Sequence, residues 1–207
     1  MIERAPREAA EEAKNTARLE TFADGVFAIA ITLLVLEIRI PEAGENLTDA
    51  LLAQWPSFAA YVTSFLGIGV IWVSHHQMFA IIHRTTPTFL FLNVVFLLPV
   101  AFIPYPTALV AQHIQEPGNA TVAVVLYGAV STAVALMFNV LWAYAIRASL
   151  VARGAAAVAA EIAARGFRLG PLIYLGATIL APVSPLLSMG LFAVFAVYWM
   201  LPGRIPS

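Results

Sequence analysis

Long apolar segments separated by short polar loops dominate this chain and restrict the structures that it can adopt. Residues 25–36 include no charged side chain, and similar apolar segments recur almost to the end of the chain. A helix that crosses a lipid bilayer needs about 20 mostly apolar residues. Charged residues make up 11% of this chain, whereas they make up about 25% of a typical soluble domain. The sequence therefore predicts an all-α integral membrane protein in a lipid bilayer.

The lengths of the apolar segments predict six transmembrane helices per subunit. We place them at residues 19–38, 55–81, 88–111, 120–146, 167–184 and 187–202. The last apolar run, 169–203, is too long for one crossing at about 1.5 Å per residue, and the prolines and serine within 181–185 favour a turn. Residues 1–18 are expected to form a cytoplasmic or interfacial segment. Residues 19–203 are expected to form the six-helix transmembrane domain.

The basic side chains are distributed unevenly over the two sides of the membrane that these spans define. Ten of the eleven lie on the side of the two termini, and only Arg39 lies on the other. Cytoplasmic loops carry an excess of Lys and Arg, so both termini are predicted to be cytoplasmic. The mixture of acids and bases before the first span is unlike a cleavable signal peptide. Residues 147–168 are rich in alanine and arginine and are expected to form an interfacial helix.

Composition argues against several classes of function. A net charge of −1 leaves no basic face for nucleic acid, and the absence of cysteine excludes disulfides and thiolate chemistry. His75 and His76 are sequence neighbours, so on a helix they point about 100° apart and are poorly placed to bind one metal ion. Neither a metal site, a cofactor nor an enzymatic centre is expected.

Hydrogen-bonding side chains from four predicted spans lie toward the cytoplasmic side of the membrane. They are Asp24, Trp72, His75, His76, Gln77, Asn93 and Asn139. Ionisable side chains within a membrane usually face the interior of a helix bundle or an aqueous cavity. Two interpretations are open: these groups hold the bundle together by mutual hydrogen bonds, or they support the mouth of a pathway. The first is favoured for the histidines and asparagines, and both can hold together.

One stripe of the first span is apolar. It consists of Phe22, Ile29, Leu33 and Leu36, with Thr32 beside it. Residues at these intervals share one side of a helix. Spacing alone favours an ordinary contact between helices. Around a symmetry axis, the same side chains would form a hydrophobic constriction of the kind that gates pores by excluding water.

The same span resembles the signature of the transmembrane-protein-175 (TMEM175) family, which comprises endolysosomal potassium channels and bacterial relatives. The resemblance lies in Arg18-x-x-x-Phe22-Ala23-Asp24, followed by GVFAIAITLLVLEI. The family motif reads Arg-x-x-x-Phe-Ser-Asp, with a threonine further along, where this chain has Thr32. The later stretch WVSHHQMF is similar to the second helix of the family.

The resemblance implies a potassium-preferring cation channel: a homotetramer with a passive pore lined by the first span of each subunit. The apolar constriction matches Ile29, Leu33 and Leu36, and a position implicated in selectivity matches Thr32. The side chains that would support the pore helix are Arg18, Phe22, Asp24, His75 and His76. Its partners would be potassium ions and lipid, and its location the bacterial inner membrane.

One residue departs from the family motif, because its serine is Ala23 here. Alanine cannot make the hydroxyl hydrogen bond, which contributes about 0.5–1.5 kcal/mol, so the contacts near Asp24 must be satisfied differently. The alternative function is a proton-coupled secondary transporter that uses Asp24 and His75 or His76 as a proton relay. A carrier predicts saturable, pH-driven uptake, whereas a channel predicts passive flux along the electrochemical gradient.

Overall fold

The computed structural model describes the backbone of residues 4–151, 154 and 168–201, and the side chains among them from Thr16 onward. These parts of the chain are helical, apart from loops and an isolated bridge between Ile82 and Val151. The elements are α1 (Arg4–Leu33), the 3-10 helix η1 (Leu34–Glu37), α2 (Leu47–Ala53), α3 (Trp55–Ala80), α4 (Pro87–Phe102), α5 (Pro104–His113), α6 (Asn119–Arg147), α8 (Gly170–Leu180) and α9 (Pro185–Met200). The predicted all-helical class is confirmed.

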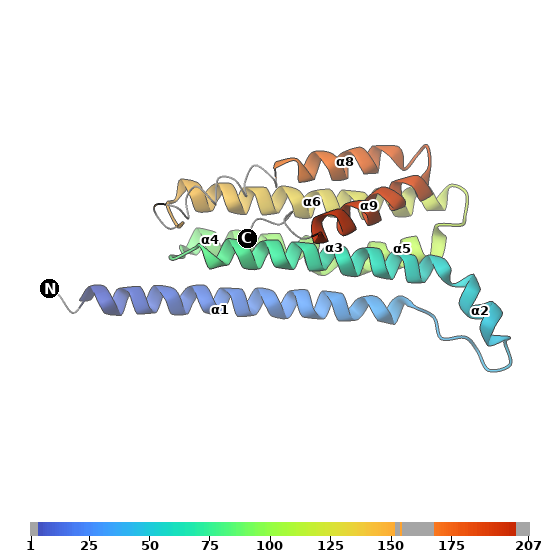
Figure 1. Cartoon of the computed structure of the whole chain (residues 1–207), viewed down its shortest axis with the longest axis horizontal. Helices are drawn as coiled ribbons and strands as arrows, with labels where there is room; N and C mark the ends of the chain where they lie inside the picture. Colours follow the sequence, from blue (N-terminus) through green and yellow to red (C-terminus); the bar gives the residue numbers. More distant parts are fainter. Residues whose placement is uncertain (1–3, 152–153, 155–167, 202–207) are drawn as a thin grey trace.

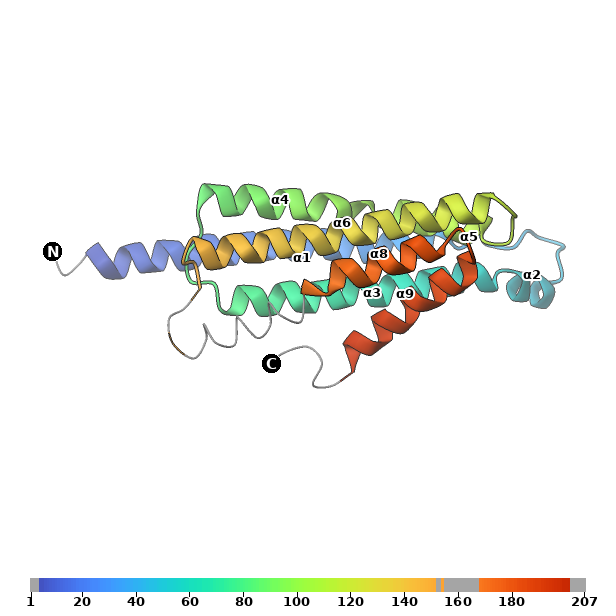
Figure 2. The same cartoon turned by 90° about the horizontal axis from the view of Figure 1, so that it is seen from above.

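The long helices lie side by side along one axis and alternate in direction. Figures 1 and 2 show α1, α3, α4 with α5, and α6 in an elongated bundle, with the α8–α9 hairpin on one side. Within this arrangement α8 packs along α6, and α9 packs against α3. The beginning of α1 and the end of α9 point toward the same end of the bundle (Figure 1).

Four helical segments in the described part of the chain are long and apolar enough to cross a membrane. They are Thr16–Glu37, Trp55–Ala80, Pro87–His113 and Asn119–Arg147. The helices α8 and α9 have 11 and 16 residues, which correspond to about 16 and 24 Å at 1.5 Å per residue. Both are shorter than the roughly 30 Å hydrocarbon core of a bilayer. The count of six crossings therefore stays a prediction.

Helix α1 is longer than the span predicted for it. A helix was expected to cross the membrane from residue 19, after a cytoplasmic or interfacial segment, but α1 runs without a break from Arg4 to Leu33. Residues 7–18 contain alanine, glutamate, lysine and arginine and lack glycine and proline. Such residues favour helix, so nothing in the sequence interrupts the backbone at the boundary between the polar and apolar parts.

The predicted span at 88–111 divides into two helices. Helix α4 ends at Phe102 and α5 begins at Pro104, with Ile103 between them. Proline has no backbone N–H and its ring crowds the preceding turn, which explains the interruption. The N–H of Ile103 donates to the Val100 carbonyl at 3.1 Å, a tight i→i−3 bond that closes the end of α4.

The last apolar run forms a hairpin, and the turn lies where the sequence placed it. Helix α8 ends at Leu180 and α9 begins at Pro185, against predicted spans of 167–184 and 187–202. The Ser184 hydroxyl accepts a hydrogen bond from the Leu187 N–H at 3.3 Å and so caps α9. Helix α8 is shorter than predicted because the turn takes Ala181–Ser184. Helix α9 has the predicted 16 residues but begins two residues earlier, because Pro185 starts it.

The loop after η1 and the segment after α6 differ from what the sequence predicted. The loop after η1 contains the short helix α2, which the sequence did not predict and which Asn46 caps by accepting from the Thr48 and Asp49 N–H groups. Earlier in this loop Arg39 donates twice to the Glu45 carboxylate, at 2.7 and 2.9 Å. The interfacial helix predicted at 147–168 falls mostly outside the described residues, and Ala148–Leu150 form a turn rather than a helix.

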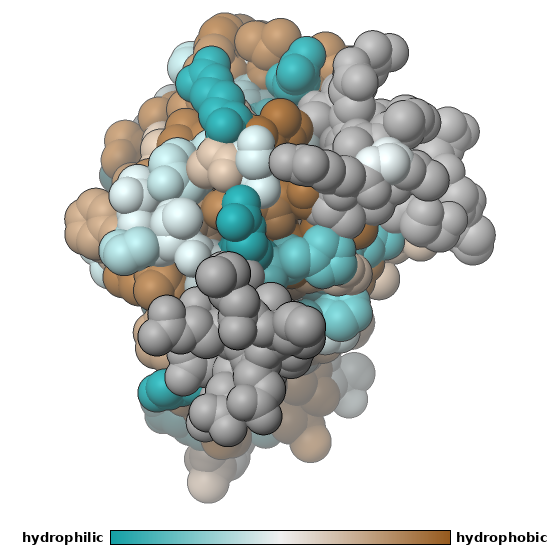
Figure 3. Space-filling view, turned by 90° about the vertical axis from the view of Figure 1, so that its left-hand side faces the viewer, coloured by the Kyte–Doolittle hydropathy of each residue, from teal (hydrophilic) through white to brown (hydrophobic). Residues whose placement is uncertain are grey.

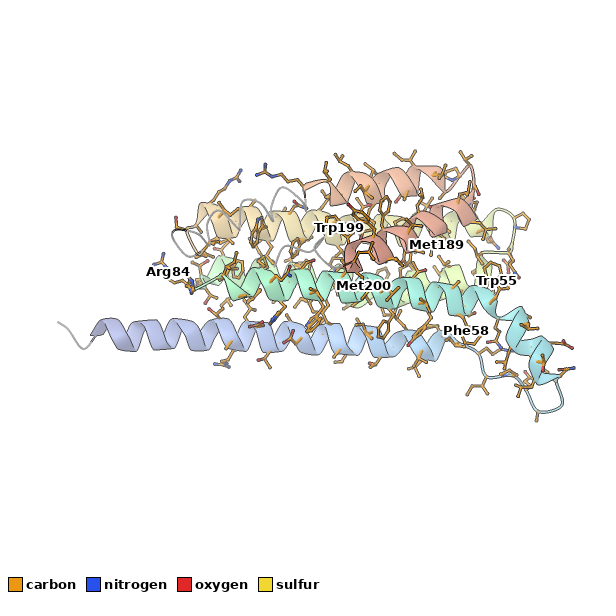
Figure 4. The ribbon with its side chains drawn as sticks, in the orientation of Figure 1. Trp55, Phe58, Arg84, Met189, Trp199 and Met200 are labelled. Carbon is orange, nitrogen blue, oxygen red and sulfur yellow. The ribbon has the colours of Figure 1, made fainter. Side chains whose placement is uncertain are left out.

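The two ends of the bundle differ in character. Figure 4 shows Arg84 in the loop at one end, after α3, and Trp55 at the opposite end, where α3 begins. Viewed onto the Arg84 end, hydrophilic side chains gather on the end face and apolar side chains surround them on the flanks (Figure 3). Tryptophan and arginine are typical of the regions where a membrane protein meets water.

The buried side chains form two clusters along the bundle. The larger lies where α1, α3, α4 and α6 meet, and its largest side chains include Phe27, Phe89, Phe96 and Leu141. The smaller lies between α5, α6, α8 and α9, around Tyr127 and Phe192. The first cluster holds α1 to the subunit, and the second holds the α8–α9 hairpin.

Candidate functional site

Helix α1 presents one face to the rest of the subunit. Its buried residues are Thr16, Leu19, Ala23, Phe27 and Ala30, and Leu34 of η1 continues the same face. Intervals of three and four residues keep them on one side of the helix. The Phe27 ring lies edge-on to His75 at 5.5 Å and 6.3 Å from Phe96. This face fixes α1 against α3 and α4.

The opposite face of α1 is exposed. Its residues are Arg18, Phe22, Gly25, Ile29, Thr32, Leu33 and Leu36. Ile29 and Leu36 are 61% and 73% exposed, so both lie on the surface of the subunit. Figure 1 shows why: α1 lies along the edge of the bundle, with the other helices on one side of it. In a membrane, such an exposed apolar stripe is covered either by lipid chains or by another protein surface.

Thr32 supplies a hydroxyl group to this otherwise apolar stretch of the exposed face. Its Oγ1 lies 2.9 Å from both the Ala28 and the Ile29 carbonyl oxygens, so its proton is used within α1. A hydroxyl oxygen also has lone pairs for accepting. The Thr32 oxygen can therefore accept a hydrogen bond from water or contact a cation on the exposed side.

Two polar contacts join α1 to α3 beside the exposed face. The Trp72 indole N–H donates to Asp24 Oδ1 at 2.8 Å. The His76 Nδ1 lies 2.8 Å from Glu20 Oε1, and an ionised carboxylate only accepts, so this nitrogen carries the proton. The two acids are four residues apart on α1, and their partners are four residues apart on the antiparallel α3. The pairs therefore fix the register and rotation of α1 against α3.

His75 points away from these pairs into the core of the subunit. It is fully buried, and its Nε2 lies 2.9 Å from Asn93 Oδ1 of α4. Its ring stacks on Phe79 at 4.4 Å and on Phe96 at 5.6 Å. His75 therefore joins α3 to α4, whereas the neighbouring His76 joins α3 to α1.

The residues predicted to support the pore helix lie in three places. Asp24 and His76 lie in the α1–α3 contact, and His75 lies in the core. Arg18 and Phe22 lie on the exposed face of α1, together with the predicted constriction and selectivity residues. The structure gives the Arg18 side chain no hydrogen bond or ion pair with another described residue.

Sequence reasoning placed Trp72 at the cytoplasmic level but did not pair it with Asp24, and it did not select Glu20, the partner of His76. The signal that could have found them is spacing, since each lies four residues from a selected polar residue on the same helix. Asn139, expected at the same depth, donates to the Ala135 carbonyl of its own helix at 2.8 Å. Among the described residues, no group of three or more His, Cys, Asp or Glu could hold a metal ion.

Known proteins have sequences similar to this chain, including the segment that contains α1 and α3. The family model described as "Endosomal/lysosomal potassium channel TMEM175" matches residues 18–104. A Chamaesiphon minutus protein named as a potassium channel is 42% identical over 197 residues, which cover 93% of this chain and 97% of the relative. The chain belongs to the TMEM175 family. A Streptomyces collinus protein, also named as a potassium channel, is 43% identical over 188 residues and covers 89% of this chain and 91% of its own length.

A solved TMEM175 structure agrees with the fold. The crystal structure of a lysosomal potassium-selective channel TMEM175 homolog from Chamaesiphon minutus superimposes with a TM-score of 0.79 at 40% identity, covering 90% of this chain and 96% of that chain. The resemblance seen in the sequence is confirmed, and the family is one of ion channels and not of enzymes. The matched segment contains every residue selected from the sequence for the pore and its support.

Proposed function

We propose that this TMEM175 family member is a subunit of a potassium-permeable channel in the bacterial cell membrane, with passive flux through a central pore. The observation that carries the proposal is the division of α1 into an anchored face and an exposed apolar face with the Thr32 hydroxyl on it. The names of its bacterial relatives, which are potassium channels, support the choice of ion.

In the proposed assembly, four copies surround an axis with the exposed faces of α1 turned inward. The assembly covers the stripe that a single subunit leaves exposed. Gly25 lies on this face with no atom within 4 Å of the position of an added Cβ, so a neighbouring α1 has room to approach there. Phe22, at 54% exposure, adds a bulky side chain to the same side.

The narrow part of the pore is assigned to rings of Ile29, Leu33 and Leu36. These positions extend over about 10 Å of the helix axis at 1.5 Å per residue. Rings of large apolar side chains exclude water when a pore is narrow, and a dry constriction stops ions. The Thr32 oxygens would form a polar ring between the Ile29 and Leu33 rings. A partly dehydrated cation would find few other oxygen ligands there.

The two hydrogen-bonded pairs between α1 and α3 would determine which face of α1 points into the pore. A helix that slips by one residue turns by about 100°, which would carry Ile29 out of a pore. The Asp24–Trp72 and Glu20–His76 hydrogen bonds oppose such a turn, because each ties α1 to a fixed position on α3. These side chains thus act on flux through the orientation of α1.

The membrane orientation completes the proposal. The alternating helix directions and the hairpin of α8 and α9 are compatible with six crossings, with α8 and α9 in a thinner or tilted environment. Arg84 lies in the loop at the end of the bundle where α1 begins (Figure 4), and Arg147 ends α6. The excess of basic residues on that side supports a cytoplasmic location for both termini.

Potassium flux from liposomes tests the function. Vesicles that contain purified protein and KCl are diluted into sodium buffer with a proton ionophore and a pH-sensitive dye, and valinomycin then reports the total sealed volume. The proposal predicts dye quenching that requires the ionophore. A carrier that exchanges potassium for protons would acidify the vesicles without the ionophore, and no flux from sealed vesicles would contradict the channel function.

The constriction is tested in the same assay by matched substitutions. Ile29→Asn replaces an apolar ring of the constriction with amide groups. Water can then hydrate the constriction, so potassium flux is expected to rise. Ile179→Asn makes the same change at a side chain of α8 that is 68% exposed and lies away from α1, and it is expected to leave flux unchanged. Equal flux from both variants would contradict the assignment of the constriction.

A further inference from the structure

A partly open cavity of about 80 Å³ lies between α3, α6, α8 and α9. Its lining includes Gly67 of α3, Asn139 of α6, Tyr174 of α8 and Trp199 of α9, and no described residue of α1 contributes to it. The two cartoon views place α9 beside α3 and α8 along α6, so the hairpin lies over this side of the bundle (Figures 1 and 2). Figure 4 labels Trp199 near the end of α9.

Three aromatic rings line one part of the cavity. Phe192 meets Tyr127 edge-on at 5.2 Å and stacks on Tyr174 at 5.9 Å. The Tyr127 hydroxyl accepts from Ser64 at 3.2 Å. Tyr174 is half-buried, and its hydroxyl makes no hydrogen bond with another described residue. It is thus available to a molecule in the cavity.

The rest of the lining determines what kind of molecule fits. None of the described lining side chains is charged, so they offer no counter-charge to an ion. The hydroxyls of Ser74 and Ser131 already donate to carbonyls of their own helices, those of Val70 and Tyr127. The cavity therefore offers an apolar wall and a few hydrogen-bonding groups, which suits a neutral molecule with one polar end.

Volume limits the size of that molecule. An apolar protein cavity of about 150 Å³ binds benzene, and this cavity has about half that volume. A phospholipid chain is too large, whereas an aliphatic chain of roughly three to five carbons is compatible. We propose that this cavity is a binding site for short-chain neutral alcohols, with the hydroxyl paired to Tyr174 and the alkyl part against Phe192.

Photolabelling tests the site without any measurement of ion flux. Purified protein is irradiated with a four-carbon diazirine alcohol, and labelled peptides are identified by mass spectrometry, with 1-butanol as competitor. We expect adducts on cavity residues of α3, α6, α8 or α9 that decrease as 1-butanol is added. Adducts found only on lipid-exposed side chains, or adducts that 1-butanol does not reduce, would overturn the proposal.

Two glycine substitutions supply the matched comparison. A Cβ at Gly67 would meet no atom within 4 Å, so Gly67→Leu extends into the cavity and is expected to abolish the competed labelling. Gly190 of α9 also has open space and lies outside the lining, so Gly190→Leu is expected to label as the unmodified protein does. Undiminished labelling of folded Gly67→Leu would refute the site.

A third variant tests the hydrogen bond and keeps the proposal testable if Gly67→Leu does not fold. Tyr174→Phe removes one oxygen and leaves the ring that stacks on Phe192. Loss of a neutral hydrogen bond corresponds to about a two- to tenfold weaker competition by 1-butanol. The same competition in Tyr174→Phe and in the unmodified protein would contradict the assigned role of this hydroxyl.

Discussion

Gly128 of α6 is predicted to be required for the close packing of α8. A Cβ added at this glycine would lie 2.1 Å from Thr178 Oγ1, 2.8 Å from Thr178 Cβ and 2.9 Å from Thr178 Cγ2. Rotation about the Thr178 side-chain bond cannot relieve this clash, because the Cβ of Thr178 does not move in such a rotation. Gly128→Ala therefore requires the backbones of α6 and α8 to separate.

The expected size of the effect follows from two opposing contributions. Overpacking a well-packed core costs about 1–3 kcal/mol, whereas replacing glycine by alanine within a helix contributes about 1 kcal/mol of stability. The net change predicted for Gly128→Ala is a loss of up to about 2 kcal/mol. The separation would also disturb the neighbouring contact of Tyr127 with Phe192.

Thermal unfolding of the purified protein in detergent measures this change, with two comparison variants. Gly176→Ala lies on α8 with no atom within 4 Å of the new Cβ, so it is expected to keep or raise the midpoint temperature. Gly128→Ala combined with Thr178→Gly removes the clashing atoms and is expected to recover part of the loss. A midpoint for Gly128→Ala equal to that of Gly176→Ala would refute the packing argument.

Three further predictions concern polar contacts. Trp72→Phe is expected to cost about 1.5–3 kcal/mol by removing the donor to Asp24, and a double-mutant cycle with Asp24→Asn in chemical unfolding isolates that contact. The hydrogen bond from Arg39 lowers the pKa of Glu45, so the contact exists above the ordinary glutamate pKa and is lost as pH falls through the lowered value. In an NMR titration, Arg39→Gln should return this pKa toward the ordinary value. Asn46→Ala is expected to cost about 1 kcal/mol and to speed amide exchange in α2.

The sequence predicted α3 and α6 well because each is a long apolar segment with clear ends. The limits of α3 and α6 differ from the structure by one residue at each affected end. Helix ends set by proline were harder to place. Pro104 divides a span that hydropathy treats as continuous, and Pro185 starts α9 earlier than expected.

The sequence predicted which residues of α1 share a face, but not which side chains they contact on the neighbouring helices. The spacing of Ile29, Leu33 and Leu36 placed them on one face of a helix, and the structure leaves that face exposed. The choice between His75 and His76 depended on how α3 is rotated against α1 and α4, which one sequence does not reveal. The partners Glu20 and Trp72 depended on the antiparallel register of α1 and α3, which arises only when both helices pack.

The central claim, that the exposed face of α1 lines an ion pathway, is tested most directly at Thr32. The chain has no cysteine, so Thr32→Cys introduces a unique thiol in place of the hydroxyl. Silver ions, which are monovalent and bind thiolates, are added during the potassium flux assay, with Ile179→Cys as the control and with nitrate salts in place of chloride salts because silver chloride precipitates. The account predicts that silver stops flux through Thr32→Cys and leaves Ile179→Cys unaffected. Undiminished flux through Thr32→Cys in saturating silver would contradict it.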